Sequence, residues 1–410
     1  MLKEFFKRFD VVLMLATVAI VTIGIFAIYS ATFSSETEAD LYSKQMIFAV
    51  VGFVLMIVIT YIPTKYLSNT SYILYALSLL ALIAVLVVGK KISGQKSWFS
   101  IGSFGIQPSE FAKLATIMAL GRFFAAEDKD RDIKNPKTFI IAALMILAPV
   151  ALIFKQPDMG TILVFLAMAI PIFFWAGLSP FVVFVIISPG IVAVCSFFGM
   201  YYMIGALVLI GLALFFFFKK KILVTVIILV INIGAGLSTE YVYGKLQPYQ
   251  QKRIMTVFDP TSDPLGSGYN VIQSKVAIGS GGLTGKGYLE GTQTQLKFIP
   301  EQWTDFIFCM VGEEFGFIGS IVLLILYFII IFQLINSAYL ARNKFLSICC
   351  IGFGTVFLFH LFVNIGMKVG IMPVIGIPLP LISYGVYSLL SFMMMLGIGM
   401  NAYRNRKLYM

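Results

Sequence analysis

Charged residues are scarce in this chain of 410 residues. They make up 12% of it, whereas hydrophobic residues make up 60%. The mean hydropathy is accordingly high, at +0.95. A water-soluble domain of this length cannot bury that much apolar surface in its core. The composition therefore excludes an ordinary soluble enzyme or binding module and indicates a protein embedded in a membrane.

Histidine and cysteine are also rare, with one histidine and four cysteines. The cysteines lie in apolar runs and have neither the spacing of a metal site nor the framework of a disulfide-rich secreted domain. The net charge of +11 would suggest a nucleic-acid partner in a soluble protein. Here the basic residues lie mainly in short loops and at the two ends, which indicates orientation in a membrane instead. No nucleic-acid partner is expected.

Apolar runs long enough to cross a bilayer as helices recur along almost the whole chain. The first follows a basic flank and is too long for a secretory signal, which predicts a retained span. The weakest contains Glu110 and Lys113. We predict about twelve spans, at residues 10–31, 44–62, 70–89, 109–125, 137–154, 160–177, 180–199, 202–218, 222–243, 305–337, 346–368 and 384–403. The sequence thus predicts an all-α polytopic bundle forming one membrane domain over residues 1–410.

Loop charge predicts how the spans are threaded. With the N-terminus in the cytoplasm, both chain ends and every strongly basic short loop become cytoplasmic. Three segments then lie outside, at residues 90–107, 244–304 and 369–385. The second, called the outer segment below, is too long for a passive connection. Its basic residues run against the tendency of lysine and arginine to stay on the cytoplasmic side. Either long loops cross the membrane regardless of charge, or these basic residues attract an anionic outer-leaflet substrate.

The outer segment contains two Asp-Pro pairs, Asp259-Pro260 and Asp263-Pro264, followed by Gly266-Ser267-Gly268. Proline fixes the backbone and glycine permits tight turns, so the pattern predicts carboxylates presented on a shaped loop rather than on a helix. Asp-Pro is also common in ordinary turns, and the local pattern leaves that alternative open.

Together with sequences elsewhere in the chain, this pattern resembles the signature of the SEDS family of shape, elongation, division and sporulation proteins. The resemblance covers most of the chain. In the outer segment and just after it, the matching stretches are Asp263-Pro264-Leu265-Gly266-Ser267-Gly268-Tyr269, Gly279-Ser280-Gly281-Gly282-Leu283, Gly285-Lys286-Gly287, Phe298-Ile299-Pro300-Glu301 and Thr304-Asp305-Phe306-Ile307-Phe308. Elsewhere they are Tyr29-Ser30-Ala31, Gln107-Pro108-Ser109-Glu110-Phe111-Ala112-Lys113, Lys155-Gln156-Pro157-Asp158-Met159-Gly160-Thr161 and Gly376-Ile377-Pro378-Leu379-Pro380-Leu381-Ile382-Ser383-Tyr384-Gly385.

Within that family, Gly291-Thr292-Gln293-Thr294-Gln295-Leu296 resembles the elongation-type members more than the division-type members. Trp303 stands where many members have histidine, so no catalytic histidine is expected there. Members are usually drawn with ten spans, and we interpret the additional apolar sequence at residues 201–239 as an inserted helical hairpin. Two added crossings preserve the sidedness of everything that follows.

The resemblance implies a peptidoglycan glycosyltransferase that polymerises lipid II at the outer face of the bacterial cytoplasmic membrane during cell elongation. Such a reaction needs a base for the acceptor hydroxyl and cations for the departing diphosphate. The family's essential aspartate matches Asp263, which we assign as general base, with Asp259 in a supporting or turn-forming role. Lys113 and Arg253 are the candidates for binding the diphosphate, because positive charge stabilises that leaving group.

Three further residues are candidates for substrate binding. Glu110 lies on the same helical face as Lys113, and the two are expected to pair or to line the catalytic cavity. Asp158 lies in a short outer turn, where it is a substrate ligand or a helix cap. Trp98, in the first outer segment, contacts substrate or anchors the membrane interface.

Other polar residues have simpler explanations. His360, Asn364 and Lys368 share one helical face and are expected to point into the bundle, with the histidine hydrogen-bonded in the core. Glu313 and Glu314 are expected near the start of the long span 305–337, hydrated in the headgroup region.

No cofactor is certain from the sequence. A divalent cation, Mg²⁺ or Mn²⁺, held by Asp263 with Asp259 or Glu110 is compatible with the chemistry of a diphosphate leaving group, but carboxylates alone do not specify a metal.

Two other functions stay open. The many spans and buried polar residues suit a transporter that flips lipid II, although the chain lacks the paired repeat of alternating-access transporters. The third candidate is a scaffold that only activates a partner, which the crowded outer segment disfavours. The resemblance also implies a single-span class B penicillin-binding protein as partner and a polyprenyl-diphosphate-linked glycan as product.

Overall fold

The computed structural model describes residues 9–35, 37–92, 95–101, 104–126, 132–263, 266–300 and 302–406. It divides into two compact units. The first unit consists of Met1–Ala176 and Thr256–Met410, and the second unit consists of Gly177–Met255. The first unit contains every predicted site residue except Arg253.

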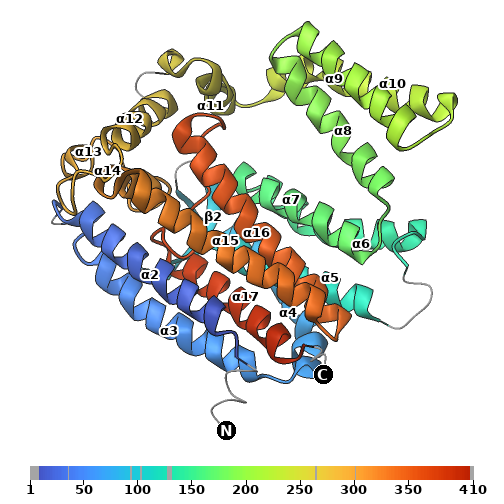
Figure 1. Cartoon of the computed structure of the whole chain (residues 1–410). Helices are drawn as coiled ribbons and strands as arrows, with labels where there is room; N and C mark the ends of the chain where they lie inside the picture. Colours follow the sequence, from blue (N-terminus) through green and yellow to red (C-terminus); the bar gives the residue numbers. More distant parts are fainter. Residues whose placement is uncertain are drawn as a thin grey trace. The chain divides into compact units, whose positions relative to one another are not determined.

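Helices dominate the first unit (Figure 1). Its long helices are α2 (Val11–Thr32), α3 (Leu41–Tyr61), α4 (Thr64–Val88), α5 (Pro108–Ala125), α6 (Pro136–Phe154), α7 (Met159–Ala176), α15 (Gly316–Leu340), α16 (Lys344–Val369) and α17 (Val386–Arg404). Shorter elements are the 3₁₀ turn η3 (Pro260–Ser262), α12 (Ser267–Ser280), α13 (Thr292–Gln295) and α14 (Ile307–Glu314).

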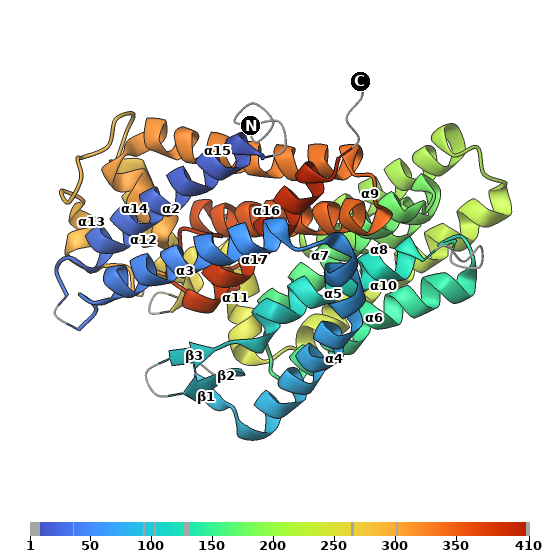
Figure 2. The same cartoon turned by 90° about the horizontal axis from the view of Figure 1, so that it is seen from below.

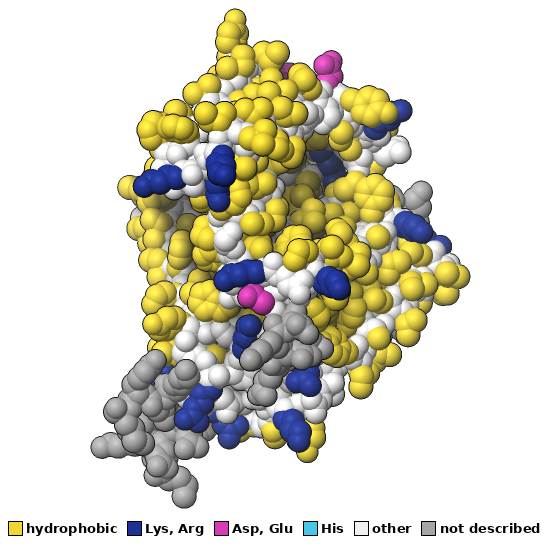
Figure 3. Space-filling view, turned by 90° about the vertical axis from the view of Figure 1, so that its right-hand side faces the viewer, with side chains coloured by type: hydrophobic (Ala, Val, Ile, Leu, Met, Phe, Trp, Pro, Cys, Tyr) yellow, Lys and Arg dark blue, Asp and Glu magenta, His cyan; other side chains and the backbone are white. Residues whose placement is uncertain are grey.

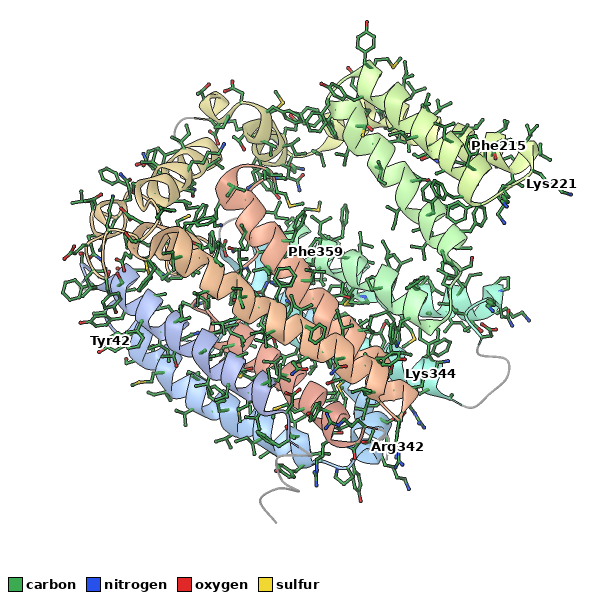
Figure 4. All side chains as sticks on the ribbon, viewed as in Figure 1. Tyr42, Phe215, Lys221, Arg342, Lys344 and Phe359 are labelled. Atoms are coloured by element: carbon green, nitrogen blue, oxygen red, sulfur yellow. The ribbon has the colours of Figure 1, made fainter. Side chains whose placement is uncertain are left out.

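The second unit is built from α8 (Pro180–Phe197), α9 (Met200–Leu212), the π-helical turn η2 (Ala213–Phe217) and α10 (Ile222–Lys245). Helix α11 (Pro248–Phe258) begins in this unit and ends in the first. A small apolar core joins the helices, and the buried Asn232 amide donates to Ser188 Oγ at 3.1 Å. Figure 4 places Phe215 and Lys221 near the turn between α9 and α10. That α9 and α10 form an inserted hairpin over residues 201–239 stays a prediction.

Eleven of the described helices are long and apolar enough to cross a membrane, which confirms the predicted polytopic helical fold. The remaining predicted span, α5, is not among them because it carries Glu110, Lys113 and Arg122. Its side chains are nevertheless almost all buried, so α5 is enclosed by other helices rather than by lipid.

Many apolar side chains on the outer surfaces of the spans are exposed. Val87 of α4 is 74% exposed and Phe217 of η2 is 85% exposed. In Figure 3, hydrophobic side chains cover most of the face shown, with lysines and arginines scattered among them. Contact with lipid accounts for such a surface, because it would be unfavourable in water.

The core of the first unit lies along α16 and α17. In each of these helices, 72% of the residues in the most apolar stretch are buried. Helix α16 packs against α5, α7 and α15, and α17 packs against α3 (Figure 2). The buried face of α16 includes His360, Asn364 and Lys368, at 2%, 0% and 0% exposure, as their spacing predicts.

The predicted single span 305–337 is wrong in one respect, because the chain breaks into α14 and α15 at Gly316, whose φ is +63°. Carbonyl groups released by the break accept hydrogen bonds from the outer segment: Glu313 O from Lys286 N at 3.0 Å and Glu314 O from Gly287 N at 3.1 Å. In return, Phe317 N and Ile318 N donate to the carbonyls of Gly282 and Leu283. The break therefore fixes the outer segment to the bundle.

A small antiparallel sheet occupies the first outer segment, which the sequence did not predict. Its strands are β1 (Lys90–Ile92), β2 (Gln95–Ile101) and β3 (Phe104–Ile106), in the order β1-β2-β3. Lys90 pairs with Trp98, and Phe99 pairs with Ile106.

The basic loop that contains Arg342 and Lys344 and the helices α12, α13 and α14 of the outer region lie at opposite ends of the first unit. Arg342 and Lys344 lie at the end where α2 starts and α17 stops, while Tyr42, at the start of α3, lies at the opposite end with α12, α13 and α14 (Figures 1 and 4). A backbone bridge joins Ala341 to Arg406. This arrangement agrees with the predicted threading, and which end faces the cytoplasm stays a prediction.

Candidate functional site

The two Asp-Pro pairs have different structures. Asp259 caps η3, with Oδ1 accepting from Thr261 N at 2.9 Å and from Thr261 Oγ1 at 2.6 Å. Asp263 follows η3 directly and is half-exposed. Asp259 therefore forms the start of the turn, and Asp263 lies at its end, where the chain enters α12.

Glycine is required where α12 begins beside Asp263. A Cβ on Gly266 would lie 2.3 Å from Asp263 Oδ2, and a Cβ on Gly268 would lie 2.0 Å from Pro260 O. The Asp263 side chain could move away from a Cβ at position 266, but the Pro260 carbonyl is main chain, so position 268 admits only glycine. The N-terminus of α12, with Gly266 as its N-cap, stabilises negative charge at that position.

A second polar cluster lies inside the bundle at the start of α5. Lys113 Nζ donates to Glu110 Oε1 at 2.9 Å, and both side chains are buried. Glu110 Oε2 accepts from Ser391 Oγ of α17 at 3.3 Å. The sequence prediction that Glu110 and Lys113 pair is confirmed.

The histidine of α16 completes this cluster. His360 Nδ1 lies 3.0 Å from Pro378 O, which can only accept, so Nδ1 carries the hydrogen. Nε2 is left as an acceptor, and Lys113 Nζ lies 3.3 Å from it. His360 is thus the hydrogen-bonded core histidine that its helical face predicts, and Lys113 uses two of its three N–H donors within the protein.

Asp158 adjoins the cluster and caps α7. Its Oδ1 accepts from Thr161 N at 3.1 Å, and its Oδ2 accepts from Thr161 Oγ1 at 2.8 Å and from Gln107 Nε2 at 3.1 Å. Burial raises the pKa of the Asp158 carboxyl above its ordinary value, against the lowering effect of the Thr161 hydrogen bonds. The helix-cap interpretation fits these contacts, and they join the starts of α5 and α7.

Trp98 and Arg253 are on elements other than those that carry Asp263, Glu110, Lys113 and Asp158. The half-buried ring of Trp98 packs on Gly105 of β3, where a Cβ would approach it to 3.1 Å. Arg253 is on the part of α11 that belongs to the second unit, with its guanidinium 5.6 Å from the centroid of the Tyr249 ring. Their roles in substrate binding stay predictions.

Sequence reasoning placed Glu313 and Glu314 wrongly. Both are buried rather than hydrated, with Glu313 at 0% and Glu314 at 1% exposure. Glu313 accepts from Lys286 Nζ at 2.8 Å, from Gln293 N at 2.8 Å, and from the N–H and hydroxyl of Thr294 at 2.9 and 2.8 Å. The stretch Gly291-Thr292-Gln293-Thr294-Gln295-Leu296 thus serves as a backbone cradle for a carboxylate.

The charge state of Glu313 follows from those contacts. Burial alone would raise its pKa, but the Lys286 ammonium and the donors of Gln293 and Thr294 lower the pKa below its ordinary value. The pKa of the adjacent Glu314 is raised instead, chiefly by burial. The two neighbouring carboxyls are therefore tuned in opposite directions.

The structure brings Glu110, Lys113 and Asp158 together and places Asp263 on a glycine-lined turn of the outer segment. Among the residues that it describes, no three His, Cys, Asp or Glu side chains gather closely enough to hold a metal ion. The divalent ion stays a prediction.

Comparison with known proteins bears on the whole chain. The family profile described as a cell cycle protein, covering FtsW, RodA and SpoVE, matches residues 11–206 and 198–408. The chain is 34% identical to the peptidoglycan glycosyltransferase MrdB of Escherichia coli, over 97% of this chain and 94% of that protein. It is 33% identical to the peptidoglycan glycosyltransferase RodA of Treponema pallidum, over 96% and 97% of the two chains.

Solved structures give the same result. One similar chain comes from work on structural coordination of polymerization and crosslinking by a peptidoglycan synthase complex, with a TM-score of 0.70 and 28% identity over 97% of this chain and 98% of that one. Another is the rod shape determining protein RodA of Thermus thermophilus, with a TM-score of 0.63 and 26% identity over 98% of both chains.

Proposed function

The chain belongs to the SEDS family of FtsW, RodA and SpoVE proteins and is a multi-pass membrane peptidoglycan glycosyltransferase, and we propose that Asp263 is its general base. The observation that carries this assignment is the contrast between the two Asp-Pro pairs. Asp259 caps η3 through Thr261, whereas the Asp263 carboxylate lies against Gly266, beside the N-terminus of α12.

In the proposed reaction, an acceptor sugar hydroxyl of lipid II attacks the anomeric carbon of the donor sugar. The bond from that carbon to the diphosphate breaks, and the polyprenyl diphosphate leaves with the electron pair. Asp263 takes the hydroxyl proton, which raises the nucleophilicity of the oxygen as the new bond forms. The product is a lengthened glycan still linked to polyprenyl diphosphate.

The diphosphate needs positive charge, and Lys113 and Arg253 are our candidates. Lys113 keeps one N–H donor beyond those directed at Glu110 and His360. Arg253 offers a planar fork that suits phosphate oxygens. Glu110 orients Lys113 through their buried ion pair, while Asp158 positions the start of α7. Trp98 is proposed to contact the substrate at the membrane surface.

The decisive experiment uses purified full-length protein, lipid II, and the variants Asp263→Asn and Asp259→Asn. Asparagine keeps the turn at position 259, because it caps as well as aspartate does. We expect glycan polymer from the parent and from Asp259→Asn, and at least about 100-fold less from Asp263→Asn. Equal polymer from Asp263→Asn would remove the assigned base. Lipid II movement across vesicles without polymer would favour the flippase.

The partner and the sidedness are further proposals. A class B penicillin-binding protein would crosslink the glycan, as the synthase complex described for the similar solved chain suggests. We also propose that the protein lies in the cytoplasmic membrane with both termini inside. A membrane-impermeant thiol reagent on intact cells should label Glu290→Cys and spare Asn343→Cys; the opposite pattern would reverse the threading.

A further inference from the structure

The structure buries the ammonium of Lys368, the penultimate residue of α16. Its side chain is fully buried, and Nζ has no hydrogen-bond partner among the described residues. This ammonium lies 3.7 Å from the centroid of the Phe306 ring, and Asp305 and Cys309 act on it electrostatically. A buried ammonium that donates no hydrogen bond is unfavourable unless something else satisfies it.

A cavity of about 220 Å³ lies beside this ammonium. It is lined by Lys275, Ile278, Gly279, Lys368 and Val369, so that the described lining includes two lysines and no carboxylate. The lysines come from different elements, α12 and α16, which pack together. The lining therefore has positive charge on two elements and apolar surface between them.

The end of α16 is shaped to admit the second lysine. Gly370 adopts a left-handed conformation, with φ of +76°, and a Cβ at that position would lie 2.5 Å from Lys275 Nζ. The glycine therefore lets the Lys275 side chain lie against the C-terminus of α16, where the helix dipole favours a cation. Lys275 is an exposed residue, so the cavity can be reached from outside.

We propose that this cavity binds a phosphate or diphosphate ester, the chemistry shared by anionic lipid headgroups and polyprenyl diphosphates. Two monovalent cations match a phosphate dianion, and phosphate oxygens supply the acceptors that the Lys368 ammonium needs. Ile278 and Val369 suit the apolar part of a lipid next to its headgroup. Position at the end of a membrane span favours a ligand from the bilayer over a free metabolite.

The test measures ligand-induced stabilisation of full-length protein in zwitterionic detergent, with inorganic pyrophosphate in one arm and phosphatidylglycerol in the other. A ligand that binds only the folded protein raises its Tm in proportion to occupancy. We compare the parent with Lys368→Met, Lys275→Gln and the control Lys44→Gln, which removes one lysine from α3. Sodium chloride at matched ionic strength controls for screening.

We expect both ligands to raise the Tm of the parent and of Lys44→Gln. Lys368→Met and Lys275→Gln should bind about 10-fold to 100-fold more weakly, the range expected for loss of one charge-assisted hydrogen bond. Stabilisation by phosphatidylglycerol alone would assign the site to a headgroup, and stabilisation by pyrophosphate alone would assign it to a free or prenyl diphosphate.

Lys368→Met should also raise the Tm of the ligand-free protein, since it removes a buried charge. Lys275 is exposed, so its variant folds whatever happens at position 368. Equal stabilisation of all four proteins, or none of the parent, would overturn the proposal. Because no glycosyl transfer is measured, failure here leaves the role of Asp263 untouched.

Discussion

The ammonium of Lys286 lies 2.8 Å from the carboxylate of Glu313, a residue 27 positions later that is fully buried on α14. The pair joins the outer segment to the helical bundle. Since Glu313 also accepts from the backbone of Gln293 and Thr294, one carboxylate fixes two stretches of the outer segment.

Replacing Glu313 by glutamine should therefore loosen the outer segment. The amide keeps the shape but leaves Lys286 without its ion pair and turns one acceptor into a donor facing N–H groups. We expect a loss of about 2 kcal/mol in stability, measured by thermal unfolding, and faster proteolysis within residues 281–300. The control is Glu38→Gln, which breaks the exposed pair with Lys297 at 4.0 Å and should change stability by less than about 1 kcal/mol. Equal effects of the two changes would contradict the buried anchor.

The lowered pKa of Glu313 predicts how this anchor responds to pH. Because the folded pKa lies below that of the unfolded chain, the stabilisation is complete above the ordinary carboxyl pKa of about 4.3 and is lost as the pH falls through the folded pKa. The Tm difference between parent and Glu313→Gln should shrink on acidification. A pH-independent difference would rule out the charge of Glu313 as the cause.

Glu314 should show the opposite pH dependence, because its pKa is raised. The stability that a raised carboxyl pKa contributes is present at low pH and is lost as the pH rises through the folded pKa. Thermal unfolding of the parent and Glu314→Gln should therefore show the parent losing stability relative to the variant as the pH increases. A Tm difference that moved the other way would contradict the opposite tuning of the two neighbouring carboxyls.

Two substitutions at Asp158 separate capping from charge. An asparagine side chain there would still accept from Thr161 N, so Asp158→Asn should keep the Tm of the parent or exceed it, since a buried charge is removed. Asp158→Ala loses the cap and should cost about 1 kcal/mol. If Asp158→Asn kept its Tm but lost polymerisation, the carboxylate would be a substrate ligand instead.

Substitution of Gly285 tests the backbone contacts at the break between α14 and α15. Its φ is +84°, and a Cβ would lie 2.1 Å from Glu314 O. We expect Gly285→Ala to cost more than about 2 kcal/mol, through strain and the displaced carbonyl. Gly234 of α10 has open space around it, so Gly234→Ala should be neutral or stabilising by up to about 1 kcal/mol. Similar stability of the two variants would argue against the close packing.

The buried pair of Glu110 and Lys113 calls for a double-mutant cycle. Either Glu110→Gln or Lys113→Met alone leaves a buried charge unpaired and should cost about 3 kcal/mol. The double variant should recover part of that loss, and additive losses would mean the two charges act independently. Recovered stability without recovered polymerisation would separate a role in diphosphate binding from a role in folding.

The sequence predicted much of this structure because hydropathy is a long-range pattern. Spans were found within a few residues, and the pairing of Glu110 with Lys113 followed from helical spacing. The break at Gly316 is not predicted because the main-chain hydrogen bonds that stabilise it join residues 313–318 to residues 282–287, and such long-range pairs leave no local pattern. Burial of Glu313 is not predicted for the same reason, since its partners Lys286, Gln293 and Thr294 lie 19 to 27 residues earlier in the chain.

The sequence also does not predict the short strands or the boundaries between the two units. The sheet at residues 90–106 is made of strands too short for alternation to be visible, two of them with three residues. The assignment of Arg253 to the second unit depends on packing between helices, which no local pattern encodes.

The main-chain bonds across the α14–α15 break have a consequence for engineering. Chimeras that exchange only residues 244–304 between relatives would keep half of each pairing, and the main-chain bonds require glycine at both 285 and 316. A graft whose join lies beyond Ile318 carries both partners together and should fold with a foreign bundle. The loop and the first turn of α15 would then behave as one transplantable part.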